Sequence, residues 1–218
     1  MKKYAPLYLA MAFTANSAFA ANSVDLAVTG SITPAACDIS LTSGGIFDLG
    51  EIENSDLEQS ERTVLPYSYG QMNIDCGSPQ LVAFKVIDNR PDSVPSGGDI
   101  AQYQTFGLGS DSQVAPIGYY TILQKYGSTA IVDGNTGYIK ISGDGGNNWS
   151  TPANQVMFYS YNKLSIIQAY SASNNSHDPI TNASIELQVV PTIQPLNTLD
   201  TSEIINIDGS ATIELIYL

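Results

Sequence analysis

Short stretches in which apolar and polar residues alternate recur along the chain, and no long apolar stripe of helical period appears. Alternation places every second side chain on one face of a strand, so each stretch predicts a half-buried β-strand. Clusters rich in glycine, proline and asparagine lie between the stretches and predict turns. The predicted strands cover residues 23–32, 71–76, 81–88, 119–126, 137–142, 155–161, 184–190, 203–209 and 211–218.

Many short strands joined by polar turns are typical of a β-sandwich, so the sequence predicts an all-β fold. The stretch "LSIIQAYS" (residues 164–171) fits a short helix as well as a strand, and the pattern leaves both open. Residues 90–119 are rich in loop-forming residues and fit an insertion between strands. No internal repeat or linker marks a second globular domain.

The first twenty residues have the layout of a secretory signal peptide. Lys2 and Lys3 precede an apolar run over residues 5–13, and Ala18-Phe19-Ala20 provides a small-x-small cleavage pattern. The run is shorter than the roughly 20 residues of a membrane-spanning helix. We therefore expect cleavage after Ala20, export, and no membrane insertion.

The charge balance narrows the classes of partner. Removing the leader takes away Lys2 and Lys3 and leaves six basic residues against 21 acidic ones, a net charge of about −15. A chain this acidic is repelled by phosphates and by anionic lipids, which argues against nucleic acid or a membrane surface as its partner.

Two cysteines, Cys37 and Cys76, are the only ones in the chain. In an oxidising compartment the natural interpretation is a disulfide between them, closing a loop of about 40 residues. A redox or metal-binding pair is the alternative, but neither a CxxC spacing nor a histidine cluster accompanies them.

Apolar alternation reaches both ends of the mature chain, although protein termini are usually polar and frayed. Near the amino end it involves Val24, Leu26, Val28, Gly30 and Ile32, and at the carboxyl end Ala211, Ile213, Leu215 and Tyr217, just before Leu218. Two explanations stay open from the pattern alone. These are ordinary first and last strands of a closed sandwich, or strands that pair with another chain.

Particular stretches resemble a known family. An alternating strand followed by "GSITPAAC", a second cysteine about forty residues later and a terminal "ATIELIYL" resemble a chaperone–usher pilin subunit. The longer stretches "GSITPAACDISLTSGGIFDLG", "NIDCGSPQLVAFKVIDNR" and "IDGSATIELIYL" resemble the GltF-like periplasmic family, which has no assigned function and is viewed as pilin-like. Residues 120–200 match only in general β character.

The resemblance implies an incomplete immunoglobulin-like sandwich that lacks its last strand. It divides the chain into a signal peptide (1–20), an extension carrying a donor strand (21–36) and a pilin-like domain (37–218). In such subunits the extension fills the open groove of a neighbouring subunit. The implied groove-filling side chains are Val24, Leu26, Val28 and Ile32, with Gly30 where the groove is shallow.

The resemblance also assigns the carboxyl end a role. The face formed by Ala211, Ile213, Leu215 and Tyr217 would meet a periplasmic chaperone, and basic residues of that chaperone would hold the carboxylate of Leu218. The expected function is that of a structural, non-enzymatic subunit of a bacterial surface fimbria, passing through the periplasm. Its expected partners are the chaperone, an outer-membrane usher and neighbouring subunits.

The alternative is a self-complete secreted or periplasmic β-sandwich that binds a ligand. The loop "SGDGGNNWS" (142–150) resembles the Asp-box turn of sialidase-like propellers and offers Asp144, Asn147 and Trp149 as candidate glycan contacts. Turn formation by Asp, Asn and Gly explains the same loop without a ligand. We expect no catalytic residues, cofactor or metal, since neither a G-x-S-x-G motif nor EF-hand spacing is present.

Overall fold

The computed structural model describes residues 24–31, 36–97, 102–150, 156–160, 163–169 and 178–218, and the chain divides into two units, Met1–Thr33 and Pro34–Leu218. In the first unit, residues 24–31 form no strand. The side chains of Val24, Leu26 and Val28 there are 94%, 90% and 91% exposed. Gly30 is likewise exposed, whereas Ile32 lies outside the described residues.

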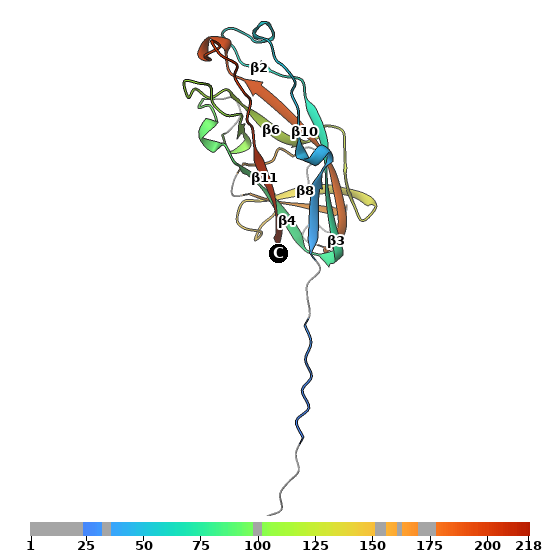
Figure 1. Ribbon diagram of the computed structural model, residues 1–218. Helices are drawn as coiled ribbons and strands as arrows, with labels where there is room; N and C mark the ends of the chain where they lie inside the picture. The colour runs from blue at the N-terminus through green and yellow to red at the C-terminus, as the bar shows by residue number, and fades with distance from the viewer. Residues whose placement is uncertain (1–23, 32–35, 98–101, 151–155, 161–162, 170–177) are drawn as a thin grey trace, which may run out of the picture. The chain divides into compact units, whose positions relative to one another are not determined.

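The described part of the second unit is built from β-strands and short 3-10 turns, without an α-helix (Figure 1). The strands are β1 (Cys37–Leu41), β2 (Thr63–Val64), β3 (Ser68–Gln80), β4 (Val82–Asp88), β5 (Phe106–Gly107), β6 (Gly118–Gln124), β7 (Ala130–Val132), β8 (Asn135–Ser142), β9 (Leu164–Ala169), β10 (Ile180–Ile193) and β11 (Ala211–Tyr217). The 3-10 turns are Thr42–Gly45, Asn54–Asp56, Pro91–Ser93, Gln102–Gln104 and Leu196–Thr198. The prediction of an all-β fold is confirmed.

All strand pairs are antiparallel, and the main path through the sheet runs β1-β3-β10-β7-β8-β9-β4-β11. The 14-residue strand β10 organises it: β3 pairs along one side, and β6 and β7 pair along the other. The two ends of the path, β1 and β11, are the edge strands.

The chain itself brings these two edges together. Only Leu81 separates β3, the neighbour of β1, from β4, the neighbour of β11. Near that point the backbone N–H of Leu218 donates to the carbonyl oxygen of Leu81 at 3.0 Å. The N–H of Cys37 donates to the hydroxyl of Tyr217 at 2.7 Å. The sheet is therefore nearly closed, in a barrel-like arrangement.

The alternation of apolar and polar residues along the strands decides which side chains enter the core. On β3, Met72, Ile74 and Cys76 are buried while Gln71 and Asp75 between or beside them are exposed. Phe84 of β4 meets Phe158 edge-on at 5.4 Å between ring centroids. The segment with two possible interpretations is a strand, β9, because it pairs with β8 over six residues.

Three predicted strands have no ladder of their own. Residues 24–31 and 203–209 lack strand pairing, and in the described part of 155–161 only Met157 forms an isolated bridge, with Leu123. Alternation decides which face of a segment is apolar, but a strand also needs a neighbour for its backbone groups. The segment 203–209 lies where that neighbour is missing.

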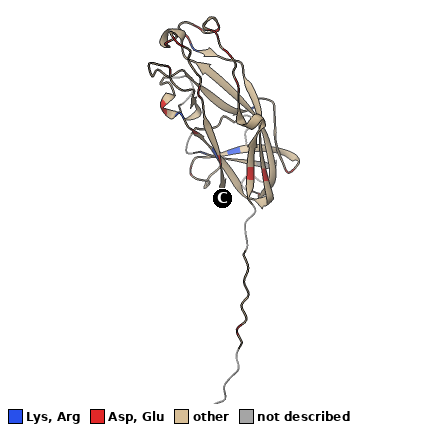
Figure 2. Cartoon of the chain, viewed as in Figure 1, with Lys and Arg blue, Asp and Glu red and all other residues tan. Residues whose placement is uncertain are grey.

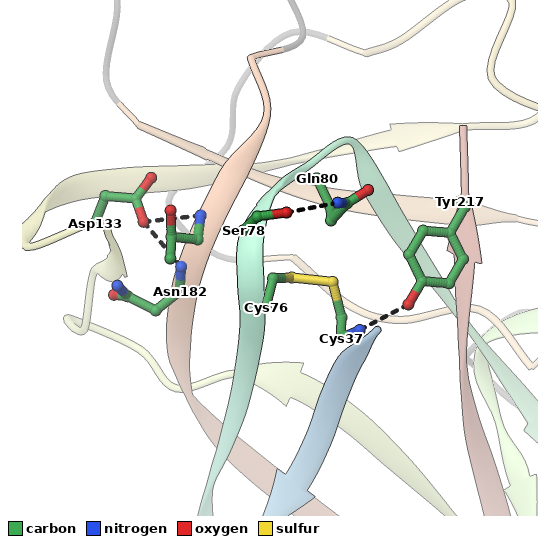
Figure 3. The surroundings of a disulfide bond; sticks show 8 residues. Cys37, Cys76, Ser78, Gln80, Asp133, Asn182 and Tyr217 are labelled. Carbon is green, nitrogen blue, oxygen red and sulfur yellow. Dashed lines mark hydrogen bonds between the residues drawn. A yellow bond between two sulfur atoms is a disulfide. The ribbon is translucent and has the colours of Figure 1, made fainter. Parts of the chain in front are cut away.

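The disulfide between Cys37 and Cys76 is confirmed (Figure 3). The two cysteines face each other across β1 and β3, 39 residues apart in the sequence. Since β1 has no strand partner other than β3 among the described residues, this bond fixes the edge strand at the point where it begins.

Replacing both Cys37 and Cys76 with alanine should lower the free energy of unfolding of the mature chain by about 4 kcal/mol, as expected from the entropy of closing a loop of that length. Denaturant titration of the variant and the wild type measures the difference. Reductant should shift the wild type toward the variant and leave the variant unchanged. Equal unfolding midpoints for all samples would contradict a stabilising role for the bond.

Candidate functional site: an apolar groove

A groove of about 980 Å³ lies between two extended segments that are distant in sequence, residues 45–53 after β1 and residues 204–213 leading into β11. Both side walls are irregular or edge backbone, and its floor is made of sheet residues. The apolar lining includes Leu41, Ile46, Phe47, Leu49, Ile52, Leu108, Tyr120, Ile122, Leu187, Val189, Ile204, Ile205, Ile207, Ala211 and Ile213.

The floor is part of the protein core. Ile122 of β6 and Leu187 and Val189 of β10 are buried, and their strands pair directly. Tyr120 lies beside them and stacks on Phe106 at 5.3 Å between ring centroids. A ligand entering the groove would therefore contact rigidly held apolar side chains.

The first wall, residues 46–52, alternates like a strand only over residues 46–50, and Ile52 then falls out of that register. Phe47, Leu49 and Ile52 are half-buried, while Ile46 is 74% exposed. The Phe47 ring lies against β3 at Gly70, where a Cβ would be 2.9 Å from the ring. The lack of a side chain at Gly70 thus allows this wall to lie close to the sheet.

The second wall is held to the sheet by polar contacts. Asp208 donates its N–H to the carbonyl oxygen of Leu108 at 2.9 Å, and Asn89 donates its N–H to Ser210 O at 2.9 Å. The guanidinium of Arg90 pairs with the carboxylate of Asp208 at 2.7 Å. Residues 205, 207, 211 and 213 are consequently held with their apolar side chains half-buried.

Asp88 organises the turn that presents Arg90. Its carboxylate accepts the N–H of Arg90 at 2.8 Å and that of Gly107 at 3.0 Å. Burial raises the pKa of Asp88, and the two backbone hydrogen bonds and the nearby Arg90 charge oppose that rise. Asp88 therefore stabilises the second wall indirectly, because it holds the backbone of Arg90, whose guanidinium pairs with Asp208.

Neither wall has a strand partner on its groove side among the described residues. β11 pairs only with β4, and residues 46–52 belong to no ladder. Unpaired backbone donors and acceptors along an edge are a template for another strand. A second hollow of about 470 Å³ shares Ile52, Ile204, Ile205 and Ile207 with the first and extends the groove.

The carboxyl-terminal strand lines the groove only as far as Ile213. Of the carboxyl-terminal face predicted from the sequence, Ala211 and Ile213 line the groove and Leu215 is half-buried further along β11. Tyr217, 51% exposed, reaches across to the first residue of β1 (Figure 3). Leu218, 44% exposed, is tied to Leu81 through its backbone.

The loop proposed to contact a glycan is held by its own hydrogen bonds. The Asp144 carboxylate accepts from the Ser142 hydroxyl at 2.7 Å and from the backbone and side-chain nitrogens of Asn148 at 2.9 and 2.6 Å. The Asn148 side chain is the main reason that the pKa of Asp144 falls to about 2. Asn147 is exposed and Trp149 is half-buried. Both Asp144 oxygens therefore stabilise the turn.

Sequence reasoning predicted strands over much of the floor and over the second wall, residues 203–209 and 211–218, but not over the first wall. The first wall, "IFDLGEI", has apolar residues at 46, 47, 49 and 52 without strict alternation, and we did not predict a strand there. The floor residues lay inside predicted strands, yet alternation does not say which strands end up beside one another. In the described parts of the chain we also find no helix long and apolar enough to cross a lipid bilayer.

Comparison with known proteins gives three similarities. The family described as "Protein of unknown function (DUF1120)" matches residues 26–113. Protein GltF of Escherichia coli (strain K12) is 30% identical over 254 residues, covering 98% of this chain and 96% of GltF. The uncharacterized protein YhcF of the same organism is 29% identical over 237 residues, covering 95% of each chain.

Changing Tyr217 to phenylalanine removes the acceptor for the Cys37 N–H and should lower the free energy of unfolding by about 1 kcal/mol. Amide hydrogen exchange at Cys37 should quicken in the variant. Tyr126→Phe is the matched control, because Tyr126 is 78% exposed. Unchanged exchange at Cys37 would show that the bond does not hold the two edges together.

Proposed function

Because the chain belongs to the GltF-like family, whose function is unknown, we propose that it is a structural subunit of a bacterial surface fimbria, assembled by donor-strand exchange. The observation that carries this proposal is the apolar groove between two walls that have no strand partner on their groove side among the described residues, one of which continues into the carboxyl-terminal strand β11. We further propose that the domain is an incomplete immunoglobulin-like sandwich and that the groove marks its missing strand.

The extension carries apolar side chains that match the apolar lining of the groove. Val24, Leu26 and Val28 are almost fully exposed and lie on alternate positions of an unpaired segment. Burying three such side chains is worth roughly 5–9 kcal/mol before the cost of ordering the segment. That is comparable to the stability of a whole domain, so insertion would add substantially to the stability of the subunit that receives it.

The proposed sequence of events follows from these two parts. After export, a periplasmic chaperone covers the groove with a strand of its own and contacts β11. At the outer-membrane usher, the extension of the next subunit replaces that strand. In each complex, backbone hydrogen bonds hold the inserted strand, and alternate side chains fill the apolar lining.

Glycan binding by a self-complete sandwich has weaker support. Both carboxylate oxygens of Asp144 are engaged within the loop, and Trp149 is half-buried. No groove or hollow described above includes this loop.

Changing Val28 to aspartate should block polymerisation and leave the chaperone-bound monomer intact, because an unpaired charge in an apolar groove is costly. Ala27→Asp is the matched control, since it puts the same charge on the outward face. Fimbria yield and the amount of chaperone–subunit complex measure the two steps. Normal fimbriae from the Val28 variant would rule out this donor strand.

Changing Ile213 to aspartate puts a charge on the groove wall and should abolish co-purification with the chaperone. Thr212→Asp tests the opposite face of the same strand, where aspartate can still accept the hydrogen bond that the Asn89 amide now donates to Thr212 at 3.0 Å. The expected result is capture of the Thr212 variant only. Equal capture of both variants would mean that the chaperone does not use this groove.

A further inference from the structure

The rim of the groove is acidic. Asp48 and Glu51 belong to the first wall, and Glu53 follows it directly. All three line the groove, are exposed, and form no ion pair within the described residues. Glu203 lines the second hollow. No lysine or arginine is found among the described residues that line either cavity.

The cations nearest to the second wall are already engaged. Lys85 of β4 pairs with Glu214 of β11 at 2.9 Å, and Arg90 pairs with Asp208 at 2.7 Å. Figure 2 shows how sparse the basic residues are on the described ribbon. An incoming strand therefore meets carboxylates along the first wall that no cation among the described residues neutralises.

The extension of this chain does not complement that rim. With Val24, Leu26 and Val28 facing inward, the outward positions are Asp25, Ala27 and Thr29, which bring one acid and no base. Two mature copies also repel each other, because each carries a net charge of about −15.

We propose that the groove takes its strand from a different polypeptide, one with apolar residues at alternate inward positions and at least one lysine or arginine at an outward position beside Asp48, Glu51 and Glu53. A second copy of this chain is then the weaker donor. This inference rests on the proposed function, because it assumes that the groove accepts a strand.

The charge effect is modest for each pair and depends on salt. Exposed ion pairs contribute little individually, so the preference comes from the summed effect of three carboxylates on one short segment that lines the groove. Such interactions weaken as the Debye length falls from about 10 Å at 0.1 M salt to about 3 Å at 1 M. The apolar contribution to binding does not weaken in this way.

The test uses the mature chain and two labelled peptides. One peptide has the sequence of residues 23–33, and the other differs only by Asp25→Lys. Fluorescence anisotropy at about 0.05 M and about 1 M salt gives the four affinities. We expect the lysine peptide to bind about fivefold more tightly at low salt, and this advantage to vanish at high salt.

Charge reversal in the groove gives an independent check. The variant Glu51→Lys should lose the preference for the lysine peptide and bind the native peptide more tightly than the wild type does. Asp38→Lys, which makes the same change of net charge at an exposed position of β1 outside the groove lining, should keep the wild-type preference.

The outcomes separate the two proposals. Equal affinities of the two peptides, or a preference for the native one, would overturn the inference of a foreign donor and leave the acceptor groove standing. If neither peptide binds, both the inference and the proposed function fail. A preference that Asp38→Lys and Glu51→Lys alter equally would also overturn the inference, because net charge and not the rim would then be responsible.

Discussion

Unpaired backbone along two facing walls is the constraint on which the rest of this structure depends. Because β3 continues into β4 through Leu81 alone, the edge strands β1 and β11 lie close together at one end. There the Tyr217 hydroxyl accepts a hydrogen bond from the Cys37 N–H. Beyond that end, residues 46–52 and 204–213 bound an apolar groove with no strand between them. Such an edge is hazardous until it is covered, and this favours a protein that works with a partner strand.

Several contacts around the groove hold its two walls in place. The disulfide fixes the start of β1, the Arg90–Asp208 pair and the Leu108 carbonyl hold the second wall, and Gly70 lets Phe47 lie against the sheet. The floor is core, with Ile122, Leu187 and Val189 buried from below. Filling the groove would thus extend the core without rearranging it.

Much of the local structure could be predicted from the sequence, because side-chain alternation and cysteine count are local signals. The strands β4, β8 and β11, the all-β class and the Cys37–Cys76 bond are examples. The walls could not be predicted in the same way. Segment 203–209 alternates like a strand but lacks a ladder, and the role of 46–52 arises only when β1 and β11 approach each other. Which edges meet is decided by long-range pairing, which period-two alternation does not encode.

Hydrogen exchange measured by mass spectrometry on the mature subunit, alone and in an assembled fibre, tests the central claim most directly. Backbone amides of residues 46–52 and 204–213 that have no hydrogen-bond partner within the subunit should exchange rapidly in the isolated subunit and become strongly protected in the fibre, because an inserted strand would then bond to both walls. The Asp208 amide, which donates to Leu108, and the β11 amides that bond to β4 should be protected in both states. Amides of the central strand β10 should be protected in both states. Strong protection of both walls in the isolated subunit, unchanged on assembly, would mean that the domain is complete by itself and would contradict the account.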